Sequence, residues 1–114
     1  MSDLNDRTAA MVADRFRALA DATRLRILNA LRTGEATVGQ LVSATGLGQA
    51  NVSKHLQTLH RQGFVERRKE GTSTVYRVGD PAVFDLCDLV CGRIQDQLDR
   101  QQDAMRAGVS AGDE

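Results

Sequence analysis

The sequence predicts a mainly α-helical protein with one small β-hairpin (α+β), and three features of residues 37–78 support this. The apolar residues Val52, Leu56 and Leu59 recur at i, i+4 and i+7, which places a buried stripe on a short helix. Gly46 separates that helix from the one before it. Two short strands with a polar, glycine-containing loop follow. Helix, turn, helix and hairpin in this order predict a winged helix-turn-helix.

Two further helices are expected before this stretch. The first spans roughly Asn5–Leu19, where apolar residues recur at helical spacing. The second spans about Ala22–Arg32, with Asp21 as its N-cap and Gly34 just beyond its end. The apolar face of the second helix is expected to comprise Leu25, Leu28 and Leu31, with Ile27 beside them.

The second helix of the helix-turn-helix has clear boundaries and a polar face. Gly46 allows the sharp turn before it, and Gly63 ends it as the residue after the C-cap. Gln49 and Asn51 lie in its first turn, the end that enters the DNA groove in this motif. The face opposite the apolar stripe carries Ser53, Lys54, Gln57, Thr58 and Arg61. Such groups contact base edges and phosphates in the major groove, so the helix is predicted to bind double-stranded DNA.

The hairpin is expected to comprise strands Phe64–Lys69 and Thr74–Val78 around the loop Glu70–Ser73. Three adjacent cations lie in its first strand: Arg67, Arg68 and Lys69. A basic wing beside a reading helix would contact the sugar-phosphate backbone and add affinity without sequence information. A merely solvated basic hairpin is the alternative.

The last predicted helix runs roughly from Pro81 to Gln102, with Asp80 as N-cap and the only proline at the first helical position. One face collects Val83, Cys87, Val90, Cys91, Ile94 and Leu98. This stripe is longer than a single small domain needs to cover. We therefore expect the last helix to form the interface of a homodimer, with Val83, Val90, Ile94 and Leu98 in that interface.

Composition sets the wider limits. The 114 residues fit a single domain, 1–114, and the terminal helix, about residues 81–102, is expected to serve dimerisation and sensing. The 15 basic and 15 acidic residues cancel over the chain, but residues 47–79 carry six basic against two acidic residues, a local basic surface. No apolar run approaches the ~18 residues of a membrane span, and the N-terminus does not resemble a signal peptide. A cytoplasmic protein with reduced cysteines and no membrane partner is expected.

Two segments carry a family resemblance. FRALADATRLRILNAL at residues 16–31 and LGQANVSKHLQTLHRQGFVERRKEGTSTVYRV at residues 47–78 resemble the ArsR/SmtB family of small bacterial winged-helix repressors. The resemblance implies a homodimer built from the first and last helices, which binds an imperfect palindromic operator in double-stranded DNA. It also implies that the operator is released when an inducer binds or oxidises a sensor site.

Two sensor sites known in that family do not match this chain. The thiolate site at the start of the first motif helix needs two cysteines, and residues 35–41 contain none. The zinc or nickel site across the terminal helices corresponds to Asp80, Ala82, Arg93 and Asp96. Both imidazole ligands are missing there, and an arginine would lie where the cation should bind.

Cys87 and Cys91 are the remaining sensor candidates and the only cysteines of the chain. At i and i+4 their Cβ atoms would be ~5–6 Å apart, whereas a disulfide requires ~3.5–4.5 Å. Two thiolates at this spacing can instead hold a soft metal or a metalloid, such as arsenite or antimonite, although no cofactor is obligatory. A thiol redox or reactive-sulfur sensor of the same fold is one alternative, and plain packing of two small apolar residues is another.

These features together predict a dimeric DNA-binding repressor that a thiol-reactive effector releases from its operator. The chain has no phosphate-binding glycine loop after a strand and no Cys-x-x-Cys, so an enzyme is not expected. A protein-interaction module without a sensor is the rival from another class, and the polar helix face and cationic wing argue against it. The two histidines, His55 and His60, are expected to pack with hydrogen bonds or to contact phosphate, because their five-residue spacing is not that of a metal pair.

Overall fold

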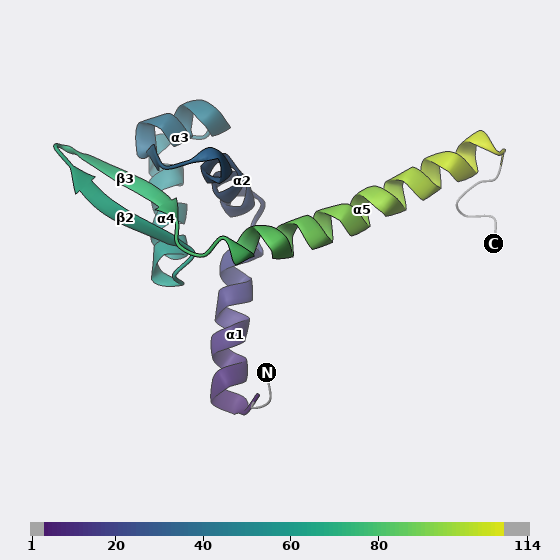
Figure 1. Cartoon of the computed structure of the whole chain (residues 1–114), viewed down its shortest axis with the longest axis horizontal. Coiled ribbons are helices and arrows are strands. Elements are labelled where there is room, and N and C mark those ends of the chain that lie inside the picture. The colour runs from purple at the N-terminus through teal and green to yellow at the C-terminus, as the bar shows by residue number, and fades with distance from the viewer. Residues whose placement is uncertain (1–3, 109–114) are drawn as a thin grey trace. The chain divides into compact units, whose positions relative to one another are not determined.

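The structure is a computed structural model that describes residues 4–108. Its elements, in chain order, are α1 (Asp6–Leu19), α2 (Ala22–Ala30), the 3₁₀ turn η1 (Leu31–Thr33), β1 (Ala36–Thr37), α3 (Val38–Thr45), α4 (Gln49–Arg61), β2 (Val65–Glu70), β3 (Ser73–Val78) and α5 (Ala82–Arg106) (Figure 1). The chain divides into two compact units, Met1–Asp80 and Pro81–Glu114. The first unit is a winged helix-turn-helix, as the sequence predicts.

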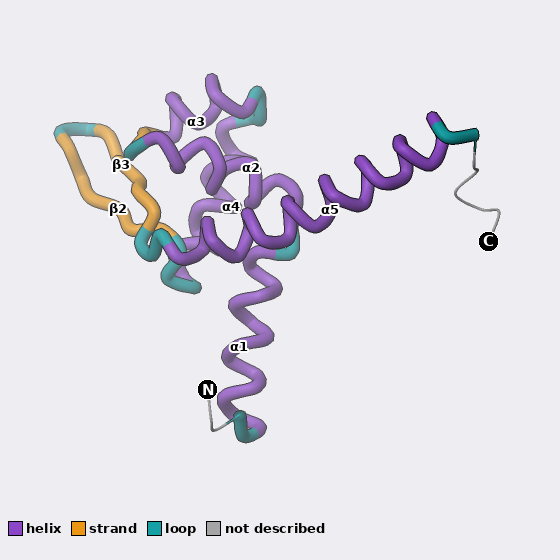
Figure 2. The backbone as a smooth tube through the Cα atoms, turned by 45° about the vertical axis from the view of Figure 1, so that its right-hand side comes forward, coloured by secondary structure: helices purple, strands orange, loops and turns teal. Residues whose placement is uncertain are grey.

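The sheet has three antiparallel strands in the order β1-β3-β2. The β2–β3 hairpin extends away from the helices as a long, narrow pair of strands (Figure 2). Glu70 pairs with Ser73, so the turn has two residues rather than the four expected, and its Gly71 has φ +62°. β1 is not predictable from the sequence pattern, because two residues are too short to show an alternation. It pairs with β3 through Ala36 and Thr37.

The core of the first unit is formed by apolar side chains that are at most 3% exposed: Ala18, Ile27, Leu28, Leu31, Leu41, Val52, Leu56, Leu59 and Val65. The predicted stripe of α4 is confirmed, since Val52, Leu56 and Leu59 are all 0% exposed. The predicted face of α2 is partly wrong. Leu25 is 39% exposed whereas Ile27 is 0% exposed, because the buried positions Ile27, Leu28 and Leu31 follow i, i+1 and i+4 and leave Leu25 on the flank.

Side chains cap the starts of three helices. Asn5 accepts from the Thr8 N–H at 2.9 Å before α1, and Asp21 accepts from the Arg24 N–H at 3.0 Å before α2, as predicted for Asp21. The hydrogen bond from the Arg24 N–H is the main reason that the pKa of Asp21 lies below its ordinary value. At α3, Thr37 and Gln40 form a reciprocal capping box at 3.2 and 2.9 Å.

Two glycines end the helices of the motif as expected. Gly46 caps α3 with φ +73°, and its N–H donates to the Val42 carbonyl at 2.8 Å. Gly63 follows α4 with φ +80°, and its N–H donates to the His60 carbonyl at 3.0 Å. The Phe64 N–H donates to the Leu59 carbonyl at 2.9 Å, which completes a Schellman motif. These bonds set the direction in which β2 leaves α4.

The second unit contains a single long helix within the described residues. α5 has 25 residues and extends to Arg106, four residues beyond the predicted end at Gln102. It begins at Ala82, one residue later than predicted. The predicted N-cap Asp80 is wrong, because Pro81 is the cap residue, with the helix-like angles φ −61° and ψ −17°. Neither α5 nor any other helix in residues 4–108 is long and apolar enough to cross a membrane.

Candidate functional site

The outer face of α4 carries the predicted DNA-contacting side chains. Five of them are exposed: Gln49, Asn51, Lys54, Gln57 and Arg61. Ser53 and Thr58 are half-buried, and the Thr58 hydroxyl accepts a hydrogen bond from Arg61 Nη2 at 3.3 Å. The helix begins after Gly48 with no side-chain cap, so its first turn is free of capping side chains. This face offers hydrogen-bonding and cationic groups together, which suits a nucleic-acid surface.

Hydrogen bonds from Arg24 connect α2 to the end of α1 and to α4. Arg24 Nε donates to the Ala18 carbonyl at 2.6 Å and Nη2 to the Arg17 carbonyl at 3.0 Å, both at the end of α1. Its Nη1 lies 3.0 Å from Nδ1 of His55, which is buried on α4. Because the arginine guanidinium has only N–H donors, Nδ1 of His55 accepts this hydrogen bond. His55 therefore has the hydrogen-bonded packing role, one of the two that the sequence suggested.

A second arginine of α2 fixes the turn of the motif. Arg26 Nη2 donates to the Thr45 carbonyl at 2.5 Å, at the end of α3. The Thr45 hydroxyl donates to the Leu41 carbonyl at 2.6 Å and accepts from the Leu47 N–H at 3.3 Å. The sequence did not predict the roles of these two arginines of α2, because an arginine in a helix shows no pattern that marks it as a cap for a neighbouring helix.

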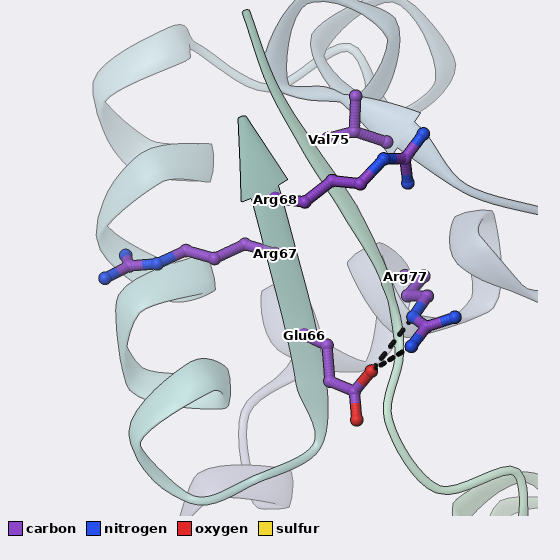
Figure 3. Close-up of a pocket in the computed structure, with 5 residues that line it drawn as sticks. All are labelled: Glu66, Arg67, Arg68, Val75 and Arg77. Carbon is purple, nitrogen blue, oxygen red and sulfur yellow. Dashed lines mark hydrogen bonds and ion pairs between the residues drawn. The ribbon is translucent and has the colours of Figure 1, made fainter. Parts of the chain in front are cut away.

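The three adjacent cations of the hairpin have different surroundings. Arg68 binds Glu35, just before β1, through two hydrogen bonds of 2.5 and 2.8 Å, and binds Glu70 at 2.7 Å. Arg77 on β3 binds Glu66 on β2 at 2.6 and 2.9 Å (Figure 3). These contacts neutralise two arginines with three carboxylates on one face of the wing.

The ion pairs shift the acid–base equilibria of the wing. Hydrogen bonds from the Arg68 side chain hold the pKa of Glu35 below its ordinary value. Hydrogen bonds to Glu35, and then to Glu70, raise the pKa of Arg68 above its ordinary value. Both partners are therefore charged throughout the neutral range.

Arg67 and Lys69 belong to the other face of the wing. Side chains alternate along a strand, and Figure 3 shows Arg67 pointing away from Arg68. In the register, Arg67 lies opposite the buried Tyr76 and Lys69 lies opposite Thr74. Both cations are exposed. The hairpin thus has one neutralised face and one cationic face.

The two cysteines lie one helical turn apart on α5. Cys87 is half-buried, Cys91 is exposed, and they are not joined in a disulfide. Within residues 4–108, no group of three or more His, Cys, Asp or Glu side chains lies close enough to hold a metal ion. A single copy of the chain therefore offers a soft ion two thiols and no third ligand of these types among its described residues.

The predicted dimer residues of α5 fall into two classes. Val90, Ile94 and Leu98 are 52%, 53% and 53% exposed, which is high for large apolar side chains. Val83 is 5% exposed and is therefore already covered. On α1, Met11 and Phe16 are also more than half exposed.

Comparison with known proteins identifies the family. Residues 21–67, which run from α2 into the wing, match the model of the bacterial regulatory protein arsR family. The probable mercury resistance operon repressor of Streptomyces lividans is 46% identical over 71 residues, which cover 62% of this chain and 57% of that protein. A transcriptional repressor SmtB homolog of Synechocystis is 34% identical over 88 residues, which cover 77% of this chain and 67% of that protein.

The chain belongs to the ArsR family.

Solved structures of transcriptional regulators have the same fold. The homodimeric winged helix-turn-helix DNA-binding domain of Mb0332 from Mycobacterium bovis superposes with a TM-score of 0.73 at 38% identity, over 88% of this chain and 95% of that one. AntR, an antimony-specific transcriptional repressor, superposes with a TM-score of 0.74 at 33% identity, over 85% of this chain and 89% of that one. These matches confirm the predicted family and fold. The matched proteins are transcriptional regulators and repressors, and this chain spans 57% of the length of the mercury resistance operon repressor.

Proposed function

We propose that this ArsR-family chain is a homodimeric transcriptional repressor that a soft metal or metalloid releases from its operator by binding Cys87 and Cys91. The observation that carries the DNA-binding part is the exposed polar face of α4, with Lys54, Gln57 and Arg61 outside a fully buried apolar stripe. A helix with this polarity can lie in the major groove while its other face stays in the core.

The proposed operator is an imperfect palindrome in double-stranded DNA. A two-fold dimer presents two copies of α4 to two half-sites, and half-sites one helical turn apart fit such symmetry. Gln49 and Asn51 in the first turn of α4 would reach base edges, together with Ser53, Lys54 and Gln57. Contacts farther along the helix, from Thr58 and Arg61, would be to phosphate.

The proposed dimer forms through α5 and α1. Val90, Ile94 and Leu98 on α5 form an exposed apolar stripe, which association would remove from water. The homodimeric domain of Mb0332, which covers most of this chain's length, supports a second copy of the chain as the partner. Val83 is nearly covered already and would contribute less than the other three.

The proposed sensor rests on the chemistry of the two thiols. Thiolates at i and i+4 point to the same side of a helix and suit soft ions, which sulfur ligands select. An effector that binds them would supply a bridge between the two sulfur atoms. Cys87 and Cys91 lie on the same helical face as Val90 and Ile94, so occupancy would change how two copies of α5 pack. The mercury and antimony regulators among the relatives support a soft-ion effector.

A salt titration tests the DNA-binding part. The wild-type protein should bind double-stranded DNA of random sequence with an affinity that falls steeply as salt rises, because phosphate contacts release counterions. Binding that does not respond to salt, or no binding, would favour a protein-interaction module instead.

An operator-release assay tests the sensor part. The reduced protein, bound to a selected duplex, is exposed anaerobically to arsenite, antimonite, cadmium or lead, and separately to peroxide or polysulfide. Release by a metal or metalloid without oxygen supports the proposal. Release that requires peroxide or polysulfide would assign the protein to redox sensing, through bonds between the cysteines of two subunits.

Single cysteine variants complete this test. Cys87→Ser and Cys91→Ser should each bind DNA like the wild type and lose nearly all release, because a hydroxyl replaces a soft thiolate ligand poorly. The two variants should behave alike, since chelation needs both sulfur atoms. Release that persists in both would show that the cysteines only pack.

A further inference from the structure

Arg68 crosses the central strand of the sheet. It lies on β2, and Glu35 lies next to β1, which is the strand on the other side of β3. A side chain that joins the two must therefore pass over β3. Val75 is the residue of β3 opposite Arg68 in the register, and it is only 7% exposed (Figure 3). An arginine that takes this path lays its aliphatic part along Val75, on the neutralised face of the wing.

The hydrogen bonds between Arg68 and Glu35 fix the orientation of the two side chains. Glu35 receives two parallel hydrogen bonds from one guanidinium, at 2.5 and 2.8 Å, and this bidentate arrangement specifies orientation as well as distance. Glu70 adds a third bond of 2.7 Å near the tip of the hairpin. One arginine thus joins the segment before α3 to both the middle and the tip of the wing.

The charges on the two faces of the wing also distinguish Arg68 from Arg67 and Lys69. Arg68 and Arg77 share their face with Glu35, Glu66 and Glu70, so that face has no excess positive charge. Arg67 and Lys69 lie on the opposite face and are exposed. A phosphate that approached Arg68 would meet two carboxylates at the same guanidinium, and this disfavours an anion there.

We propose that Arg68 is a positioning residue that ties the wing to the start of α3 through Glu35, and that Arg67 and Lys69 supply the wing's phosphate contacts. This inference rests on the proposed DNA-binding function. The sequence predicted three equivalent DNA-contacting cations, whereas here Arg67 and Lys69 contact phosphate and Arg68 positions the wing.

The sign of a charge change separates the two roles. If Arg68 contacted phosphate, Glu35→Gln would release it and strengthen binding to random-sequence double-stranded DNA. In the positioning role, Glu35→Gln loosens the wing and weakens that binding by about threefold or more. Glu66→Gln is the matched control, because it removes the same charge from the same face without touching the link to Glu35. Stronger binding by Glu35→Gln than by Glu66→Gln would overturn the proposal.

The salt slope gives a second readout. Arg67→Ala and Lys69→Ala should each reduce the slope of log affinity against log salt by about one unit, the expected loss for one phosphate contact. Arg68→Ala should lower affinity with little change in slope. The reversed pair, Arg68→Glu with Glu35→Arg, should recover part of the affinity lost by Arg68→Glu alone. A loss of one unit of slope in Arg68→Ala, with no recovery in the reversed pair, would identify Arg68 as a contact.

A DNA-free measurement keeps this inference distinct from the proposed function. Arg68→Ala and Glu35→Ala should both increase amide hydrogen exchange in β2 and β3, whereas Arg67→Ala should not. If the wild type fails to bind DNA but this exchange pattern holds, the proposed function fails and the positioning role of Arg68 stands. Unchanged exchange in both variants would overturn that role whatever the DNA result.

Discussion

Helices α4 and α5 are both amphipathic, but they use their apolar faces differently. On α4, Val52, Leu56 and Leu59 are completely buried. On α5, Val90, Ile94 and Leu98 are all more than half exposed. The same periodic pattern therefore indicates a helix in both cases. The apolar face is buried within one copy of the chain only in α4. An exposed stripe of this length indicates a surface for association.

The largest expected effect is a truncation in the buried stripe. Leu56→Ala should lower the free energy of unfolding by about 2–5 kcal/mol, because it leaves a cavity in a packed core. Its matched partner is Leu98→Ala on α5, which is 53% exposed. Urea denaturation at several protein concentrations distinguishes them. The Leu56→Ala loss should appear at every concentration, whereas a Leu98→Ala loss should appear only where the wild type is dimeric.

A charge in the exposed stripe tests the dimer. Ile94→Asp should weaken self-association by at least tenfold, because a carboxylate would have to be buried without a partner. Analytical ultracentrifugation measures this, and Gln95→Glu provides a control with the same added charge one residue away. A dimer mass that is unchanged in Ile94→Asp would mean that the stripe does not form the interface.

Gly63 and Gly92 differ in the backbone angles that they adopt, so alanine should affect them differently. Gly63→Ala should destabilise the protein by about 1–2 kcal/mol, because φ is +80° there and an L-residue pays a steric cost in the left-handed region. An added Cβ meets no atom within 4 Å, so the cost comes from the backbone alone. A thermal melt followed by circular dichroism measures the loss, and a melt equal to the wild type would contradict the Schellman geometry at the end of α4.

Gly92→Ala should act in the opposite direction. Gly92 lies inside α5, where a Cβ also meets nothing within 4 Å in one copy of the chain. Alanine should stabilise the helix by about 0.5–1 kcal/mol. Helicity and dimer mass should be measured together. Higher helicity with a weakened dimer would place Gly92 at a close approach between two copies of α5.

The smallest expected effect is a loss of the wing's ion pair in acid. The pKa of Glu35 is lowered in the folded protein, so its contribution to stability is present above its unfolded value and is lost as pH falls through the lower folded value. The difference in melting temperature between the wild type and Glu35→Gln should therefore shrink as pH falls from 6 to 3. A difference that grows over this range would contradict the lowered pKa.

Local residue chemistry was sufficient to predict much of the fold. Glycines at positions 46 and 63 take positive φ, Asp21 caps α2, and the apolar residues of α4 share one face of a helix, because each depends on a few neighbouring residues. The spacing Thr37-x-x-Gln40 also carried the signal for the capping box at the start of α3. The set of exposed polar side chains on α4 follows from the same helical period.

Other features depended on contacts between segments that are distant in sequence. β1 exists only because β3 lies beside it, and Leu25 is exposed because α2 packs through its neighbouring positions. The different surroundings of Arg67, Arg68 and Lys69 could not be read from three adjacent cations. A long side chain takes the partner that the fold brings within reach, and Glu35 is 33 residues from Arg68 in the chain.

The sequence by itself determined which segments are helical, where they turn and which faces are apolar, because these properties are set by neighbours within one or two helical turns. Only the tertiary structure decided which apolar faces are covered and which charges are paired. Both depend on the three-dimensional arrangement of elements: α4 has three other helices and a sheet to cover it, whereas the stripe of α5 remains open to solvent.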